Sequence, residues 1–179
     1  MNYQQILDFW FAPETKDHWF AKSDEFDLEI ETQFGKTLDQ ALQCELWTWR
    51  ETAQGRLAEI IVLDQFSRNL FRNHPASFAQ DSMALSLAQE AIRLGLDLTL
   101  EPEKRSFIYM PFMHSESKII HIQALELFEA LGNPINLEFE KKHKVIIDRF
   151  NRYPHRNEIL GRESTPEEIE FLKQPNSSF

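Results

Sequence analysis

The segment from Leu57 to Arg72 places a line of polar residues in an otherwise apolar helix. At about 100° per residue, Asp64, Gln65, Arg68 and Arg72 fall in one arc, while apolar residues cover most of the opposite side. A helix that is apolar nearly all round belongs inside a protein, and charges carried there must be paired, hydrogen-bonded or turned toward a cavity. The pattern therefore predicts a central helix whose polar line is either an internal brace or a binding site.

The helical period continues along the rest of the chain, and no segment shows a sustained two-residue alternation. No internal repeat of the 34-residue tetratricopeptide type is recognisable. We therefore predict an all-α fold: one domain over residues 1–173, an antiparallel array of about seven helices, and a frayed tail over residues 174–179. The expected helices cover residues 3–12, 23–42, 57–72, 75–95, 102–131, 136–153 and a short segment after Thr165.

Single residues define most of the expected helix boundaries. Ser23 is expected to cap the second helix, and Gly55 to break the chain before the central one. Pro111 should kink or split the long segment over residues 102–131, because proline removes one backbone bond and clashes with the preceding turn. Asn136 is expected to cap the next helix, and the residues Thr165-Pro-Glu-Glu168 form a capping box ahead of the last one.

Composition and charge exclude several classes of protein. Hydrophobic residues make up 42% of the 179 residues, with 15 Phe and four Trp, which excludes a disordered chain. Cys44 is the only cysteine, so no internal disulfide can form, and a reducing cytoplasm is the expected location. The N-terminus lacks signal-peptide features, and no apolar run approaches the roughly 18 residues of a membrane span. A net charge of −10 disfavours nucleic acid as a partner.

Two further segments carry residues capable of chemistry. In the first, Arg105 and Tyr109 share a helix face by their spacing of four, and His114 and Glu116 follow directly after Pro111. A kink there would place these side chains where a straight helix could not. The second segment gathers cations around a helix end at Pro154, where the helix dipole already favours positive charge. Its cationic residues are Arg149, Arg152, His155 and Arg156.

At these three segments the chain resembles the bacterial domain-of-unknown-function family 924. The resemblance rests on the stretches Leu63–Asn69, Tyr109–Glu116 and Arg149–Asn157, and extends from Ile6 to Pro166. It implies an all-helical, tetratricopeptide-like fold and no established activity. The chain departs from the family pattern at Ser67, where proline is usual, and at His121, where glutamine is usual. The motif positions it carries over are Asp64, Gln65, Arg68, Asn69, Arg72, Pro111, His114, Ser115, Glu116, Arg149, Arg152, His155, Arg156 and Asn157.

The first interpretation of these residues is structural. Asp64, Asp81 and Glu116 would neutralise arginines in a buried network that fixes how the helices dock. Removing one partner of such a pair costs roughly 3–5 kcal/mol, which is reason enough for the network to persist. His143 belongs to the same interpretation, because it shares a stripe with apolar residues and is expected to be a core histidine with one hydrogen-bond partner.

The second interpretation is a binding module with one polar cavity lined by the three segments. Arginine offers planar, bidentate donors that match carboxylate or phosphate, so the ligand would be a small anion or a peptide. Arginines outnumber the inward carboxylates, which leaves one or two guanidinium groups for the ligand. The candidate binding residues are Asp64, Gln65, Arg68, Arg72, Arg105, Tyr109, His114, Glu116, Arg149, Arg152, His155 and Arg156.

The third interpretation is a hydrolase-like enzyme in which His114 is a general base and Glu116 its orienting carboxylate. No nucleophile motif and no phosphate-binding glycine loop accompany them. His114 and Glu116 are two residues apart, which on a regular helix separates them by about 160°, so a shared metal ion requires the kink to redirect one of them. We expect no metal and no cofactor.

Overall fold

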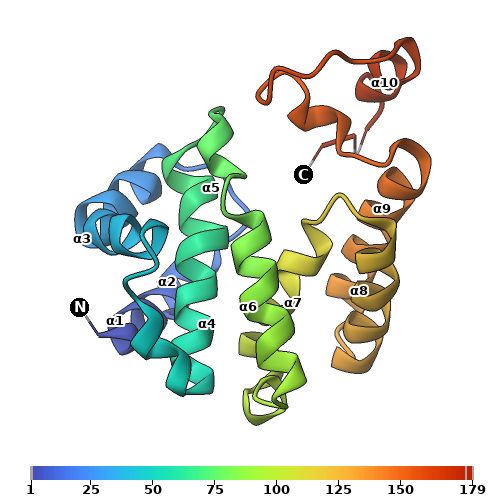
Figure 1. Ribbon diagram of the computed structural model, residues 1–179. Helices are drawn as coiled ribbons and strands as arrows, with labels where there is room; N and C mark the ends of the chain where they lie inside the picture. The colour runs from blue at the N-terminus through green and yellow to red at the C-terminus, as the bar shows by residue number, and fades with distance from the viewer. Residues whose placement is uncertain (1, 176, 179) are drawn as a thin grey trace. The chain divides into compact units, whose positions relative to one another are not determined.

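Figure 1 shows the computed structural model, which describes residues 2–175, 177 and 178. Every regular element in this described part of the chain is helical, which confirms the predicted all-α class. None of these helices is long and apolar enough to cross a membrane. The chain forms two compact units: a first unit of Met1–Arg72 and Ala76–Pro111, and a second of Asn73–Pro75 and Phe112–Phe179. The single-domain boundary at residue 173 and the tetratricopeptide-like label stay predictions.

The first unit is built around aromatic side chains from helices far apart in the sequence. The ring of Trp10 lies 5.6 Å from Phe66 and 5.8 Å from Phe107, and the rings of Phe34 and Phe66 stack at 5.5 Å. All four side chains are buried, as expected for the anchors of a core. The elements of this unit are α1 (Tyr3–Trp10), α2 (Pro13–Lys16), α3 (Asp24–Leu42), η1 (Trp47–Glu51), α4 (Ala53–Ile61), η2 (Val62–Phe66), α5 (Ser67–Leu70), η3 (Pro75–Ser77), α6 (Asp81–Arg93), η4 (Asp97–Thr99) and α7 (Pro102–Met113), of which η3 and α7 share residues with the second unit.

The central helix begins earlier than expected, and Gly55 lies inside it. Thr52 caps α4 by accepting a hydrogen bond from the backbone of Gly55, so the prediction that Gly55 breaks the chain was wrong. A Cβ atom at this position would lie 2.0 Å from the carbonyl oxygen of Trp49. Glycine is therefore needed because α4 and η1 approach each other closely, and not because the helix ends there.

The central helix is interrupted by a π-helical turn, η2, over Val62–Phe66. A π turn contains more residues than an α turn, so it rotates the following side chains away from a regular 3.6-residue projection. The interruption falls on Asp64 and Gln65, both of which are buried. The polar line predicted from the sequence therefore contains a π turn, and beyond this turn Arg68 still pairs with Asp64, four residues earlier.

The boundaries of α3 and α6 were predicted with mixed success. Ser23 caps α3 by accepting from the backbone of Phe26, as predicted. Pro75 starts the short turn η3, and α6 begins only at Asp81, so the expected helix start at Pro75 was wrong. Gly95 has a φ of +70°, which confirms it as the residue that ends α6.

The segment around Pro111 divides into two helices, but the division does not fall at the proline. α7 runs through Pro111 to Met113, and α8 starts at Lys118. The segment therefore divides after Met113 and not at Pro111, so a break at the proline was wrong, while a bend of α7 at Pro111 stays a prediction. The short connection that follows carries His114 and Glu116.

The second unit contains the helical hairpin of α8 (Lys118–Leu131) and α9 (Pro134–Phe150), which lie side by side in Figure 1. Gly132 ends α8 with a φ of +76°, and Asn133 caps α9 by accepting from the backbone of Ile135 and Asn136. The cap is thus Asn133, with Pro134 at the first helical position, and not Asn136 as predicted.

The C-terminal part of the second unit contains η5 (Pro154–Arg156) and α10 (Pro166–Leu172). The capping box of Thr165 and Glu168 is formed as predicted. The hydroxyl of Ser177 donates to the carbonyl of Leu172 at 3.1 Å. Positions 176 and 179 of the expected frayed tail lie outside the described residues, and fraying stays a prediction.

Candidate binding site

The candidate residues divide between the two compact units. Asp64, Gln65, Arg68, Arg72, Arg105 and Tyr109 belong to the first unit, and His114, Glu116, Arg149, Arg152, His155 and Arg156 to the second. The single cavity lined by all three segments stays a prediction.

Arg68 is held between two carboxylates in the first unit. Its guanidinium lies 3.0 Å from Oδ1 of Asp64 and 3.0 Å from Oδ1 of Asp81, and it also donates to the carbonyl of Asp64 at 2.7 Å. Asp64 is only 1% exposed, and the amide of Gln65 donates to it. A buried carboxylate is tolerated because these donors compensate its charge, so this part of the polar line has the form of a brace.

Arg72 has a carboxylate partner that the sequence did not suggest. Asp27, in the first turn of α3, accepts from Arg72 and, at 2.7 Å, from the amide of Asn69. The periodicity of α3 placed its acidic residues on a solvated face. The position of Asp27 directly after the buried Phe26 was the only signal that this carboxylate could turn toward another helix.

Arg105 and Tyr109 meet at Asp97, which is 3% exposed. The hydroxyl of Tyr109 donates to the Asp97 carboxylate at 2.7 Å, while Arg105 donates to the backbone carbonyls of Asp97 at 3.2 Å and Leu100 at 3.0 Å. Burial and the bond to Asp97 raise the pKa of Tyr109. The two side chains share a face as predicted, and there they hold the turn η4 in place.

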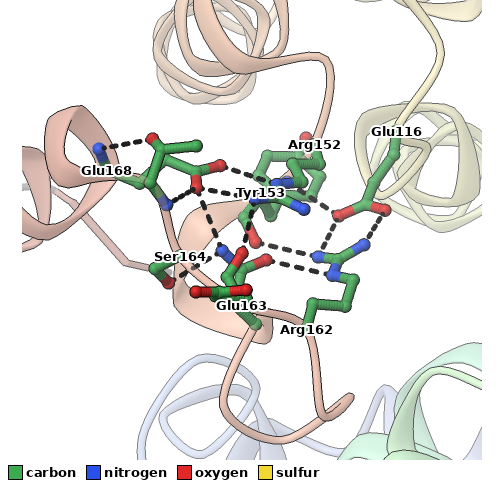
Figure 2. Close-up of polar contacts among 9 residues, drawn as sticks. Glu116, Arg152, Tyr153, Arg162, Glu163, Ser164 and Glu168 are labelled. Atoms are coloured by element: carbon green, nitrogen blue, oxygen red, sulfur yellow. Dashed lines mark hydrogen bonds and ion pairs between the residues drawn. The ribbon is translucent and has the colours of Figure 1, made fainter.

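Figure 2 shows the polar network of the second unit, in which Glu116 faces Arg162. The two side chains form a bidentate pair with distances of 2.6 and 2.9 Å, and Glu116 also accepts from the backbone N–H of Tyr153 at 2.7 Å. Burial alone would raise the pKa of Glu116, but the hydrogen bonds from Arg162 and Tyr153 outweigh it and hold that pKa below its ordinary value.

This pairing changes the role expected for Glu116. Both of its oxygens accept hydrogen bonds from Arg162, so the carboxylate orients a guanidinium and the C-terminal segment. An orienting role toward His114 would require Glu116 to release Arg162. Arg162 was missed in the sequence, because it lies in a polar loop with no periodic signal.

A second bidentate pair in Figure 2 joins Arg152 to Glu168. The guanidinium donates at 2.6 and 2.7 Å, and the backbone N–H of Thr165 adds a bond of 2.8 Å to the same carboxylate. The hydrogen bond from Arg152 is the main reason that the pKa of Glu168 falls to about 2. Arg149 pairs with Glu167 at 2.8 Å, and both of those side chains are exposed.

Tyr153 lies at the centre of a group of imidazole and guanidinium side chains. Its ring is fully buried, and its hydroxyl donates to the carbonyl of Met113 at 2.5 Å. The Arg156 guanidinium lies 4.5 Å from the ring centroid and donates to the carbonyl of His114 at 3.1 Å. The rings of His155 and His143 lie 5.5 and 5.7 Å from Tyr153. We call these five residues, His114, His143, Tyr153, His155 and Arg156, the Tyr153 cluster.

The charges around the Tyr153 cluster are reflected in the pKa of His143. Burial lowers this pKa to about 3 against an opposing hydrogen bond to the carbonyl of Phe139, and the charges of His114, His121 and Arg156 lower it further. His143 is therefore a neutral core histidine bonded to a backbone carbonyl, as predicted.

His121 is buried beside the Tyr153 cluster, with its Nε2 3.2 Å from the hydroxyl of Tyr153. It bonds to Glu140 on α9, a partner that sequence analysis did not identify. Within the described residues, no three side chains of His, Cys, Asp or Glu are grouped so that they could hold a metal ion.

Comparison with known proteins places the chain in a family. The model of the family described as "Bacterial protein of unknown function (DUF924)" matches residues 6–176, so the chain belongs to this family. It is also similar to the solved structure of a protein of unknown function from Agrobacterium tumefaciens, with 39% identity, a TM-score of 0.91 and coverage of 96% of each chain. No curated protein matches the chain. The family predicted from the three motif segments is confirmed.

Proposed function

We propose that this protein is a binding module for a small anionic ligand that carries a phosphate or carboxylate group, held at the Tyr153 cluster. One observation carries the proposal. The cationic guanidinium of Arg156 is buried against the ring of Tyr153. A buried cation, in a protein of net charge −10, favours anions locally while the rest of the surface repels them.

The chemistry of the Tyr153 cluster suits such a ligand. Arg156 is 6% exposed, and two of its contacts, the Tyr153 ring and the His114 carbonyl, are with neutral groups. Its planar guanidinium can donate two parallel hydrogen bonds to a phosphate or carboxylate. The half-buried His114 and His155 are neighbours that could add imidazole donors.

Most of the other candidate arginines are less suited to the role. Arg68, Arg72, Arg149 and Arg152 form ion pairs with carboxylates. Each would have to exchange a protein carboxylate for the ligand. We centre the site on His114, His155 and Arg156 because they lie around the buried ring of Tyr153.

The pairing of these arginines supports a second candidate function. Asp64, Asp27 and Glu168 each hold an arginine in place, so the polar motifs would serve as braces in a purely structural scaffold. The hydrolase-like alternative is less favoured, because Glu116 is engaged by Arg162. A peptide whose carboxylate carries the same charge as the small ligand is also a ligand of the proposed kind. The expected location is the cytoplasm, where Cys44 would stay reduced.

The experiment is a thermal unfolding series with inorganic phosphate or citrate at millimolar concentration, against sodium chloride of equal ionic strength. A ligand that binds the folded state raises Tm through RT ln(1 + [L]/Kd). Because such anions also stabilise proteins by exclusion from the surface, the test compares variants rather than salts alone. The test variant is Arg156→Gln. The control is Arg93→Gln, which removes the same charge at a side chain that is 67% exposed.

We expect the wild type and Arg93→Gln to show an anion-specific gain in Tm, and Arg156→Gln to lose it. A folded Arg156→Gln variant that keeps the full gain would contradict the proposal and favour the scaffold. If Arg156→Gln does not fold, His155→Gln takes its place, because His155 is half-buried and lies at the same ring.

A further inference from the structure

The second unit contains a histidine and a glutamate that are both completely buried. His121 lies on α8 and Glu140 on α9, and each side chain is 0% exposed. Nδ1 of His121 lies 2.8 Å from Oε1 of Glu140. Since a buried charge is costly unless it is paired and hydrogen-bonded, the protonation of this pair determines whether the packing is stable.

The opposite side of the imidazole ring fixes the position of one hydrogen. Nε2 of His121 lies 2.8 Å from the carbonyl oxygen of Ser115, which can only accept a hydrogen bond. The hydroxyl of Tyr153 lies 3.2 Å from the same nitrogen, and it donates its own hydrogen to the carbonyl of Met113. Both neighbours of Nε2 therefore require a donor, so Nε2 carries a hydrogen.

A second hydrogen must lie between Nδ1 and Glu140, because two lone pairs do not face each other at 2.8 Å. If it lies on the ring, the pair is an imidazolium and a carboxylate; if it lies on the carboxyl group, both partners are neutral. The two forms hold the same number of protons and have no net charge. We infer that His121 and Glu140 retain one shared proton in the folded protein, and that this proton latches the loop around Ser115 to the hairpin of α8 and α9.

The surroundings of Glu140 favour keeping that proton. Burial raises the pKa of Glu140, while the hydrogen bond and charge of His121 oppose the shift. Lys144 and Asp148 on the same helix act in opposite directions. Oε2 of Glu140 is buried and has no hydrogen-bond partner among the described residues. A carboxylate that lost the shared proton would therefore be poorly stabilised.

The latch has a consequence for stability at alkaline pH. Above a pH of about 6.5, an unfolded chain carries neutral histidine and charged glutamate, and so holds no such proton. The folded pair still holds one. Because the folded state then binds more protons than the unfolded state, the unfolding equilibrium constant should rise up to tenfold per pH unit. Loss of the proton would release the loop between His114 and Glu116, which makes the position of these motif residues sensitive to pH.

The test variant is Glu140→Gln, because a carboxamide N–H can donate to the neutral ring without an additional proton. The control is Glu138→Gln on the same helix, whose carboxylate is 66% exposed and pairs with Lys142. Urea unfolding is measured at intervals from pH 6.5 to pH 9. As the pH rises, we expect the folding equilibrium constant of the wild type and of Glu138→Gln to fall up to tenfold per pH unit. Glu140→Gln should not show this decrease. Equal pH dependence in all three proteins would overturn the inference.

A measurement on the wild type covers the case in which Glu140→Gln does not fold. Nitrogen-15 NMR of the His121 ring at pH 8 reports which ring nitrogens carry hydrogen, and carbon-13 NMR of Glu140 reports the charge of the carboxyl group. The latch predicts a hydrogen on Nε2 with either an imidazolium beside a carboxylate or a neutral ring beside a carboxylic acid. A neutral ring beside a charged carboxylate would overturn it.

Discussion

Arg152 and Glu168 join the end of α9 to the start of α10 through two charge-assisted hydrogen bonds of 2.6 and 2.7 Å. Glu168 is 2% exposed, although most of α10 is exposed. α10 is therefore held by this carboxylate together with Phe171, whose ring lies 5.0 Å from that of Phe150.

The Glu168→Gln variant tests this relationship. It should release α10 locally, because the amide keeps the shape of the side chain but loses the charge, at a cost of about 1–3 kcal/mol. Amide exchange over residues 166–172 should accelerate while the first unit stays protected. Glu167→Gln, at a carboxylate that is 63% exposed, is the control and should change exchange little. Similar exchange in both variants would show that Glu168 is not the anchor.

The brace in the first unit predicts a large effect at Asp64. Asp64→Ala should cost at least about 3 kcal/mol, since it removes a buried partner of Arg68. Glu29→Ala, on the exposed face of α3, should change stability by no more than about 0.5 kcal/mol. The measurement is the urea midpoint of unfolding of the two variants. Equal midpoints would refute the burial of Asp64.

The two helical glycines Gly55 and Gly35 should respond to alanine in opposite directions. Gly55→Ala places a Cβ atom 2.0 Å from the Trp49 carbonyl oxygen and should destabilise the protein by about 1–3 kcal/mol. At Gly35 the nearest atom is 3.8 Å away, so alanine should stabilise α3 by about 0.5–1 kcal/mol. Thermal unfolding of both variants measures these two changes in stability. A neutral Gly55→Ala variant would mean that η1 does not approach α4 so closely.

His143 should make the protein less stable in mild acid. Its pKa is lowered from 6.5 to about 3 in the folded protein, mainly by burial. Between these values the unfolded state binds a proton that the folded state does not, so stability falls as the pH drops, by up to about 1.4 kcal/mol per unit. The window from pH 6.5 to about 4.5 avoids most carboxyl titration. His143→Gln should remove this slope. If the His143→Gln variant keeps the wild-type slope of stability against pH, another group causes that slope.

Periodicity and caps predicted much of the fold, because these signals depend on residues close together in the sequence. Ser23, Gly95 and the capping box at Thr165 took their expected roles. The errors at Gly55 and in the position of the break expected at Pro111 have the opposite origin. Gly55 is required by the close approach of η1, a tertiary contact, and the helix around Pro111 continues despite the lost backbone bond.

The candidate site was predicted less completely, because ion pairs depend on which helices meet. The candidate arginines were identified by their motifs, but Asp27, Glu168 and Arg162 lie where the helical period does not predict an inward polar side chain. The excess of arginine over carboxylate inferred from the sequence is smaller once these partners are included.

The most direct test of anion binding is a phosphate titration followed by NMR at constant ionic strength, with the side-chain N–H signals of Arg156 and His155 assigned. The proposed function predicts saturable shifts at these signals and at the backbone of His114 and Tyr153 in the millimolar range or below. It also predicts that the signals of the exposed Arg93 do not move. Absence of saturable shifts at Arg156, or equal shifts at Arg93, would contradict the proposed function.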